Sequence, residues 1–164
     1  MHLLVTYGTK LGGTVDIAES IGRELSSHGY GVTVAPAVDL IAPAGFDAVI
    51  VGGSLYRGRW SRQARHYIRR YSSQLRTKPV WLFSSGPLDD SALRGIPPTA
   101  RVAHAMLRVN ARGHVTFGGR LEPDAKGILP RTMAKTKAGD WRNAEHIARW
   151  AAQIAEELRS SVAA

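Results

Sequence analysis

Cysteine does not occur in this sequence of 164 residues. Its absence excludes disulfides, thiolate metal sites and cysteine nucleophiles, and the cytoplasm is the expected compartment. Long apolar runs are lacking too, because no run approaches the roughly 20 residues that span a bilayer. The N-terminus shows no charged region followed by an apolar segment, as a signal peptide would. We therefore expect no integral membrane segment.

Acidic residues are few. The sequence has 13 Asp and Glu against 22 Lys and Arg, which gives a net charge of +9. Such a charge attracts anions, although an Arg-rich solvated surface would give the same count. No helix-turn-helix, zinc or RNA-binding motif accompanies the charge, so we expect an anionic small molecule as partner and no nucleic acid.

Apolar runs alternate with amphipathic helical patterns along the whole chain, which we expect to form one domain over residues 1–164. Uninterrupted apolar strands of this kind are typical of a parallel sheet covered by helices on both faces, so the predicted class is α/β. The expected strands are residues 3–5, 31–35, 48–51, 79–84 and 114–121, and the expected helices are 15–26, 61–74, 99–112 and 140–159. We expect Asp140 to be the N-cap of the last helix and residues 122–139 to be a long loop.

The loop after the first strand reads "YGTKLGGTV". Gly8 and Gly13 have the spacing of the nucleotide-binding GxxxxGK[ST] motif, but Thr14 stands where its lysine belongs. Glycines, hydroxyls and the start of a helix suit a single terminal phosphate, held by side-chain hydroxyls and backbone N–H groups. An ordinary Gly-rich turn is the alternative. The candidate residues are Thr9, Lys10, Leu11, Gly12, Gly13 and Thr14.

Two further loops follow the third and fourth strands, and in open α/β sheets ligands bind at such strand ends. In "GGSLYRGRW", Tyr56 or Trp60 could stack on a flat ring, or both could pack on the next helix. In "FSSGPLDD", backbone groups could meet the edge of a heterocycle, or the segment could be a plain turn. The candidate residues are Ser54, Leu55, Tyr56, Arg57, Gly58 and Trp60, followed by Ser84, Ser85, Gly86, Pro87 and Leu88.

Histidines and acids form no spacing typical of a metal site. His66, His104, His114 and His146 fall on separate elements, and no Ser-His-Asp arrangement can be argued. We therefore expect no metal, and the sequence names no catalytic residue. Whether the protein is an enzyme stays open.

The first loop resembles the phosphate loop of the flavodoxin family, whose usual form is T/S-x-T-G-x-T; Leu11 stands where a hydroxyl residue is common. The other two loops look like the second and third flavin loops of that family. The nearest likeness is to proteins related to the menaquinone-dependent protoporphyrinogen oxidase, which have an acidic-Trp pair at the start of the last helix, here Asp140-Trp141. Actinobacterial single-domain flavodoxins are similar too, and they read "PVWLFSSGPL" at the fourth strand. The resemblance implies a flavodoxin-like three-layer α/β/α sandwich, a five-stranded parallel sheet in the order 2-1-3-4-5, and noncovalent flavin mononucleotide (FMN).

A flavin-type cofactor implies electron or hydride transfer, with a redox partner protein, a quinone or an anionic small molecule as the other reactant. The deazaflavin coenzyme F-420 is an alternative cofactor, and a non-redox ligand-sensing domain is an alternative function. Cations near a flavin favour its anionic reduced form and raise its reduction potential. From the net charge and the cluster that runs from Arg57 to Arg69, we expect the basic charge to serve an anionic cofactor or substrate. A solvated helix face is the alternative for Arg62, Arg65 and Arg69.

Overall fold

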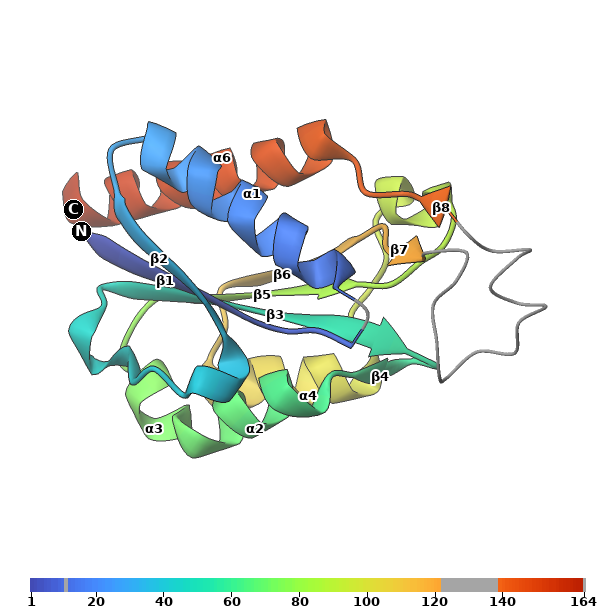
Figure 1. The fold of residues 1–164 in the computed structure, drawn as a ribbon. Helices are drawn as coiled ribbons and strands as arrows, with labels where there is room; N and C mark the ends of the chain where they lie inside the picture. The colour runs from blue at the N-terminus through green and yellow to red at the C-terminus, as the bar shows by residue number, and fades with distance from the viewer. Residues whose placement is uncertain (11, 122–138, 164) are drawn as a thin grey trace.

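A parallel sheet forms the centre of the protein in a computed structural model that describes residues 1–10, 12–121 and 139–163 (Figure 1). Its strands lie side by side in the order β2-β1-β3-β5-β6. Counting only these five parallel strands, the order is 2-1-3-4-5, and the prediction is confirmed. The strands are β1 (His2–Gly8), β2 (Gly31–Pro36), β3 (Ala48–Tyr56), β5 (Val80–Ser85) and β6 (Gly113–Phe117).

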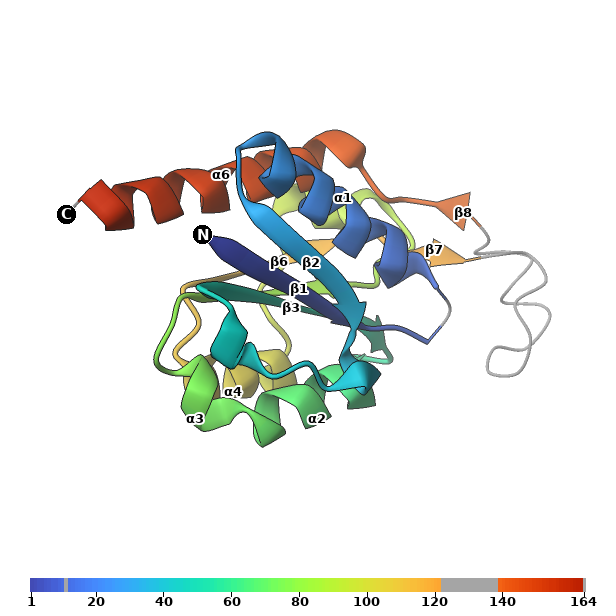
Figure 2. The same cartoon turned by 60° about the vertical axis from the view of Figure 1, so that its left-hand side comes forward.

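Helices cover both faces of the sheet, as Figures 1 and 2 show. One face carries α1 (Gly13–Ser27) and α6 (Ala144–Ala163), and the other carries α2 (Arg62–Arg70), α3 (Ser72–Leu75) and α4 (Ala100–Val109). Short 3₁₀ turns occur at Ala37–Asp39, Pro43–Gly45 and Asp90–Arg94. The three-layer α/β/α arrangement is therefore the predicted one.

Successive side chains of a strand point to opposite faces of the sheet, so each strand contributes to the core beneath both helical layers. In β3, Ala48 and Ile50 pack toward α1 and α6, whereas Val49 and Val51 pack toward α2 and α4. All four side chains are buried. This burial on both faces is why the strand is a continuous apolar run.

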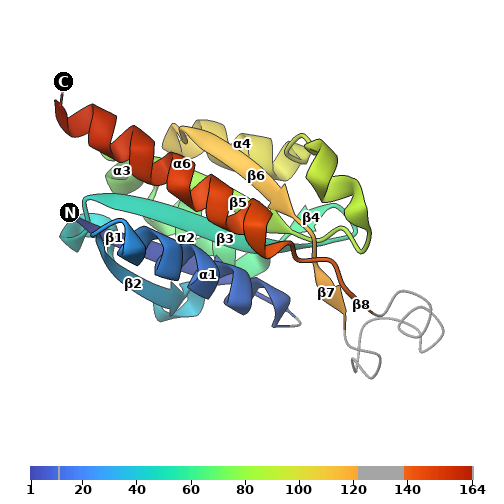
Figure 3. The same ribbon diagram turned by 90° about the horizontal axis from the view of Figure 1, so that it is seen from above.

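Several predicted boundaries were wrong. The helix expected over 61–74 is interrupted at Tyr71, so α2 and α3 are separate. The strand expected over 114–121 ends at Phe117, and after two glycines a second strand, β7 (Arg120–Leu121), pairs antiparallel with β8 (Gly139–Asp140). Figure 3 shows this pair extending beyond the end of the main sheet. Gly139 is thus in a strand, and the rest of the expected loop, residues 122–138, lies outside the described residues.

The last helix begins at Ala144 and Asp140 is not its N-cap. The side chain of Asn143 accepts a hydrogen bond from the His146 amide at 2.8 Å, which is the N-cap pattern. Asp140 instead accepts hydrogen bonds from the backbone and the guanidinium of Arg142. These bonds hold the pKa of the Asp140 carboxyl below its usual range.

None of the helices in the described ranges has the length and apolar character needed to cross a membrane.

Candidate functional site

The three predicted loops meet at the carboxyl ends of the strands, at the right-hand edge of the sheet in Figure 1. Strand register explains the meeting, because Gly8 pairs with Gly53 and Ser54 pairs with Ser85. A cavity of about 90 Å³ lies between the loops. Its lining residues are Thr9, Lys10, Gly13, Thr14, Ser54, Leu55, Tyr56, Ser85, Gly86, Leu88, Gly119 and Arg120.

The first loop ends at the N-terminus of α1. Gly12 is the N-cap with a φ of 85°, a left-handed conformation that favours glycine. Its amide donates to Thr9 Oγ1 at 2.9 Å, which closes the loop. No side chain at the N-cap accepts from the first turn of α1, so its N–H groups beside the cavity are suited to an anion. Leu11 lies outside the described residues.

A hydroxyl pair joins the first loop to the third. Thr14 Oγ1 and Ser85 Oγ lie 2.8 Å apart, and both side chains are buried at the cavity wall. One hydroxyl donates its proton in this bond and the other accepts it, so the accepting hydroxyl keeps its own O–H for a further bond. The pair can therefore donate to an anion in the cavity while remaining bonded to each other.

Tyr56 supplies an aromatic face at the end of β3. The chain then turns back through Arg57 and Gly58, with φ of 49° and 71°, into β4 (Arg59–Trp60). Two successive left-handed residues are typical of the type I′ hairpin turn. The Tyr56 ring is half-buried, with Lys10 Nζ 4.5 Å and Arg57 Cζ 5.5 Å from its centroid. Both cations thus lie at the surface where a flat ligand would stack.

Trp60 does not offer such a surface. Its side chain is 1% exposed, packs in the core beneath α2, and donates from Nε1 to the Phe83 carbonyl oxygen at 3.3 Å. The ring also occupies the space above Gly53, where an added Cβ would lie 2.4 Å from Nε1. The prediction that Trp60 stacks on a ligand was wrong. The structure shows the alternative, in which Trp60 packs against the next helix.

Ser84 is also turned away from the cavity. It is fully buried, and its hydroxyl bonds to His114 Nε2 at 2.9 Å. Burial lowers the pKa of His114 to about 4. Four other predicted residues belong to the three loops but do not line the cavity: Gly12, Arg57, Gly58 and Pro87.

Two lining residues, Gly119 and Arg120, were missed. Both residues come shortly after β6, which ends earlier than predicted, at Phe117. The backbone at Gly118 lies close to Trp141, because an added Cβ on Gly118 would lie 2.0 Å from the Trp141 carbonyl oxygen. The Gly118-Gly119 pair was the sequence signal for this close approach. Arg120 lies beside Gly13 and has its guanidinium 3.8 Å from Asp16.

The charge around the cavity is positive. Lys10 and Arg120 line it, and its lining includes no carboxylate. Asp16, in the first turn of α1, is paired with Arg142 and Arg120. No group of three or more His, Cys, Asp or Glu suited to a metal ion occurs among the described residues. The arrangement is suited to a ligand with an anionic end and a flat, partly apolar body.

A family comparison agrees with this geometry. Residues 4–138 match the model of the Flavodoxin domain family. The chain belongs to that family.

Solved flavodoxin structures share the fold. One from the domain Archaea is 17% identical, with 97% of this chain and 99% of that chain covered and a TM-score of 0.64. Oxidised flavodoxin 2 from Bacillus cereus is 16% identical, with 96% and 99% covered and a TM-score of 0.62. The rubredoxin oxygen:oxidoreductase of Desulfovibrio gigas is 13% identical, with a TM-score of 0.66; the match covers 99% of this chain and 37% of that one.

Proposed function

We propose that the chain, acting as one domain over residues 1–164, binds FMN at the strand ends and serves in electron or hydride transfer. The observation that carries the proposal is the junction of an uncapped helix start, the Thr14–Ser85 hydroxyl pair and the Tyr56 ring around one cavity without a lining carboxylate. FMN has a terminal phosphate and a flat ring, and the two ends of the cavity match these two groups.

The phosphate belongs at the first loop. The N–H groups of Gly13 and Thr14, with the hydroxyls of Thr9 and Thr14, are the donors there. Lys10 and Arg120 add positive charge. This set holds a monoester without a metal ion, which agrees with the replacement of the nucleotide-binding lysine by Thr14.

The ring belongs between the second and third loops. Tyr56 offers its face, Leu55 and Leu88 offer apolar surface, and Gly86 lets the two loops approach, since a Cβ there would lie 2.8 Å from Leu55 Cβ. The cavity of about 90 Å³ is smaller than the roughly 300 Å³ at the low end for ligand sites. Lys10 is exposed and lies over Tyr56, so movement of its side chain is the simplest way to admit the ring.

When bound, FMN supplies the redox chemistry, and the protein sets its potential and its access. Lys10, Arg57 and Arg120 are cations in or beside the site. Positive charge near the ring stabilises the reduced anion, so this chain is suited to a higher potential than an acidic carrier would give. The partner is then a redox protein, a quinone or an anionic small-molecule substrate.

Coenzyme F-420 is the second candidate cofactor, because it also presents a phosphate and a tricyclic ring. A quinone-linked enzyme related to the protoporphyrinogen oxidase is the finer functional alternative. A ligand-sensing domain without redox chemistry is the alternative from another class. The described residues identify no general acid or base at the cavity, so the carrier role is the simpler one.

The visible spectrum of the purified protein separates these candidates. FMN binding predicts flavin absorption, or its appearance when FMN is added and excess is removed. Uptake of F-420 in place of FMN would favour the deazaflavin alternative. A protein that takes up neither compound would overturn the redox proposal and leave the sensing one.

A further inference from the structure

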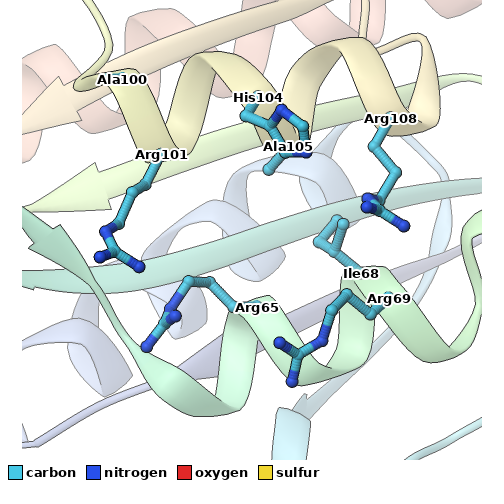
Figure 4. A pocket seen from close by; sticks show the side chains of 8 residues that line it. All are labelled: Arg65, Ile68, Arg69, Ala100, Arg101, His104, Ala105 and Arg108. Carbon is cyan, nitrogen blue, oxygen red and sulfur yellow. The ribbon is translucent and has the colours of Figure 1, made fainter.

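A second hollow lies on the opposite side of the sheet from α1, between α2 and α4. It has a volume of about 530 Å³ and shares no lining residue with the cavity at the strand ends. Figure 4 shows its lining, which is Arg65, Ile68, Arg69, Ala100, Arg101, His104, Ala105 and Arg108. We call it the α2–α4 groove.

Four arginine side chains from the two helices line the groove. Arg65 and Arg69 come from α2, and Arg101 and Arg108 extend from α4 toward α2 (Figure 4). Buried apolar side chains, Ile68 and Ala105, form part of the floor. Arg101 and Arg108 are seven positions apart, which is about 10 Å along a helix. The positive charge is therefore spread along the groove.

Acidic residues are scarce in this part of the sequence. Residues 48–121, all described, include 13 Lys and Arg but only two acids, Asp89 and Asp90. Within the described ranges no ion pair involves any of the four groove arginines. One of the four makes a backbone contact, as Arg65 Nε donates to the Trp60 carbonyl oxygen at 3.1 Å.

Like charges crowd around Arg65. Partial burial, together with repulsion from Arg101, Arg69, Arg59 and Arg62, lowers its pKa from the usual value. Salt bridges normally relieve such crowding, and the groove has none from the described part of the protein. A bound anion would supply the missing negative charge.

We propose that the α2–α4 groove is a second anion site, which binds a small oligophosphate. Guanidinium groups bind phosphate through paired N–H donors, and several of them along one groove select a chain of phosphates over a single one. The volume lies within the range of small-molecule sites, and the groove is concave, which suits a compact ligand better than the face of a partner protein. The groove lining contains no aromatic side chain on which nucleic-acid bases could stack, apart from the His104 imidazole.

Isothermal titration of the purified protein with inorganic tripolyphosphate at low salt tests the proposal. In Arg101→Ala/Arg108→Ala, we expect the dissociation constant to rise about tenfold or more, as for the loss of charge-assisted hydrogen bonds. The matched control is Arg23→Ala/Arg94→Ala, which removes the same charge at exposed positions outside the groove. We expect that control to change the constant less than about twofold.

Backbone-amide NMR of the unaltered protein gives the same test without a substitution, with shifts expected in α2 and α4 when tripolyphosphate is added. Three results would overturn the proposal: no binding, equal weakening in both double variants, or shifts confined to the start of α1. FMN titrations distinguish a failure of this proposal from a failure of the proposed function. Groove variants that lose tripolyphosphate should bind FMN as before, whereas failure of the protein to bind FMN leaves the groove result standing.

Discussion

Thr14 Oγ1 and Ser85 Oγ lie 2.8 Å apart although 71 positions separate them in the sequence. The bond joins the start of α1 to the end of β5 across the intervening β1 and β3. It fixes the first loop, the proposed phosphate site, against the third loop, which belongs to the proposed ring site. The two ends of the proposed FMN site are therefore parts of one connected structure.

Replacement of Thr14 by Val should weaken FMN binding about tenfold, because it removes a hydroxyl that donates to a charged group. Riboflavin, which lacks the phosphate, should bind as before. Fluorescence titration with both compounds measures the difference. Equal weakening for FMN and riboflavin would show that Thr14 acts on the site as a whole and not on the phosphate.

Thr14→Val also leaves Ser85 Oγ without its partner, at a cost of about 1–3 kcal/mol in the free energy of unfolding. The double variant with Ser85→Ala should recover most of this loss while binding of FMN stays weak. Thr99→Val is the matched control, because Thr99 Oγ1 is a buried hydroxyl without a hydrogen bond among the described residues. That change should leave stability equal or raised in urea denaturation.

The Tyr56 ring should contribute to binding through its face and not through its hydroxyl. Tyr56→Ala should raise the dissociation constants of FMN and riboflavin by the same factor, about tenfold, since stacking on an aromatic ring contributes roughly 1 kcal/mol or more. Tyr56→Phe should retain the affinity for both. A loss in the Phe variant as large as in the Ala variant would contradict this role.

Gly86→Ala should disturb the ring end of the site, because the new Cβ would lie 2.8 Å from Leu55 Cβ. Overpacking of this kind costs about 1–3 kcal/mol. We expect a lower free energy of unfolding and weaker binding of both FMN and riboflavin. Gly45→Ala is the control, since an added Cβ there meets nothing within 4 Å. Similar losses in the two variants would refute the close-packing argument.

Acid should destabilise the protein through His114. Burial holds its pKa at about 4, against 6.5 when exposed, so the unfolded chain binds a proton that the folded chain does not. The neutral ring favours folding above about pH 6.5, and the contribution is lost as the pH falls from there toward 4. The loss between about pH 7 and pH 5 is on the order of 2 kcal/mol.

Urea denaturation at the two pH values measures this loss in the free energy of unfolding. The His114→Gln variant should lose correspondingly less stability on acidification. His66→Gln is the control, because His66 is exposed. An unchanged pH dependence in His114→Gln would contradict the assignment.

The strands and the three loops could be predicted because they rest on local signals: continuous apolar runs, and glycines with hydroxyls at their ends. The order of the strands in the sheet came from the resemblance to the flavodoxin family and not from a local pattern. The face of the sheet to which each loop side chain points could not be predicted in the same way. Ser84 and Ser85 are neighbours in one strand, so they point to opposite faces, and only Ser85 reaches the cavity. Trp60 became a core residue because the β4 hairpin folds it back over Gly53.

The basic charge shows the same limit. The arginines at 62, 65 and 69 have helical spacing, which predicts that they share one face of a helix. The spacing does not predict which other element packs beside that face. In the structure, Arg65 and Arg69 line the α2–α4 groove with two arginines from a helix more than 30 positions further along. Pairing between α2 and α4 depends on the whole sheet, and no local pattern contains it.

The measurement that tests the central claim most directly is the affinity of the unaltered protein for FMN against its affinity for riboflavin, under the same salt. The account predicts that FMN binds with one molecule per chain and clearly more tightly than riboflavin, because the start of α1 with Thr14 and Ser85 holds the phosphate. Equal affinity for the two compounds, or binding of neither, would contradict it.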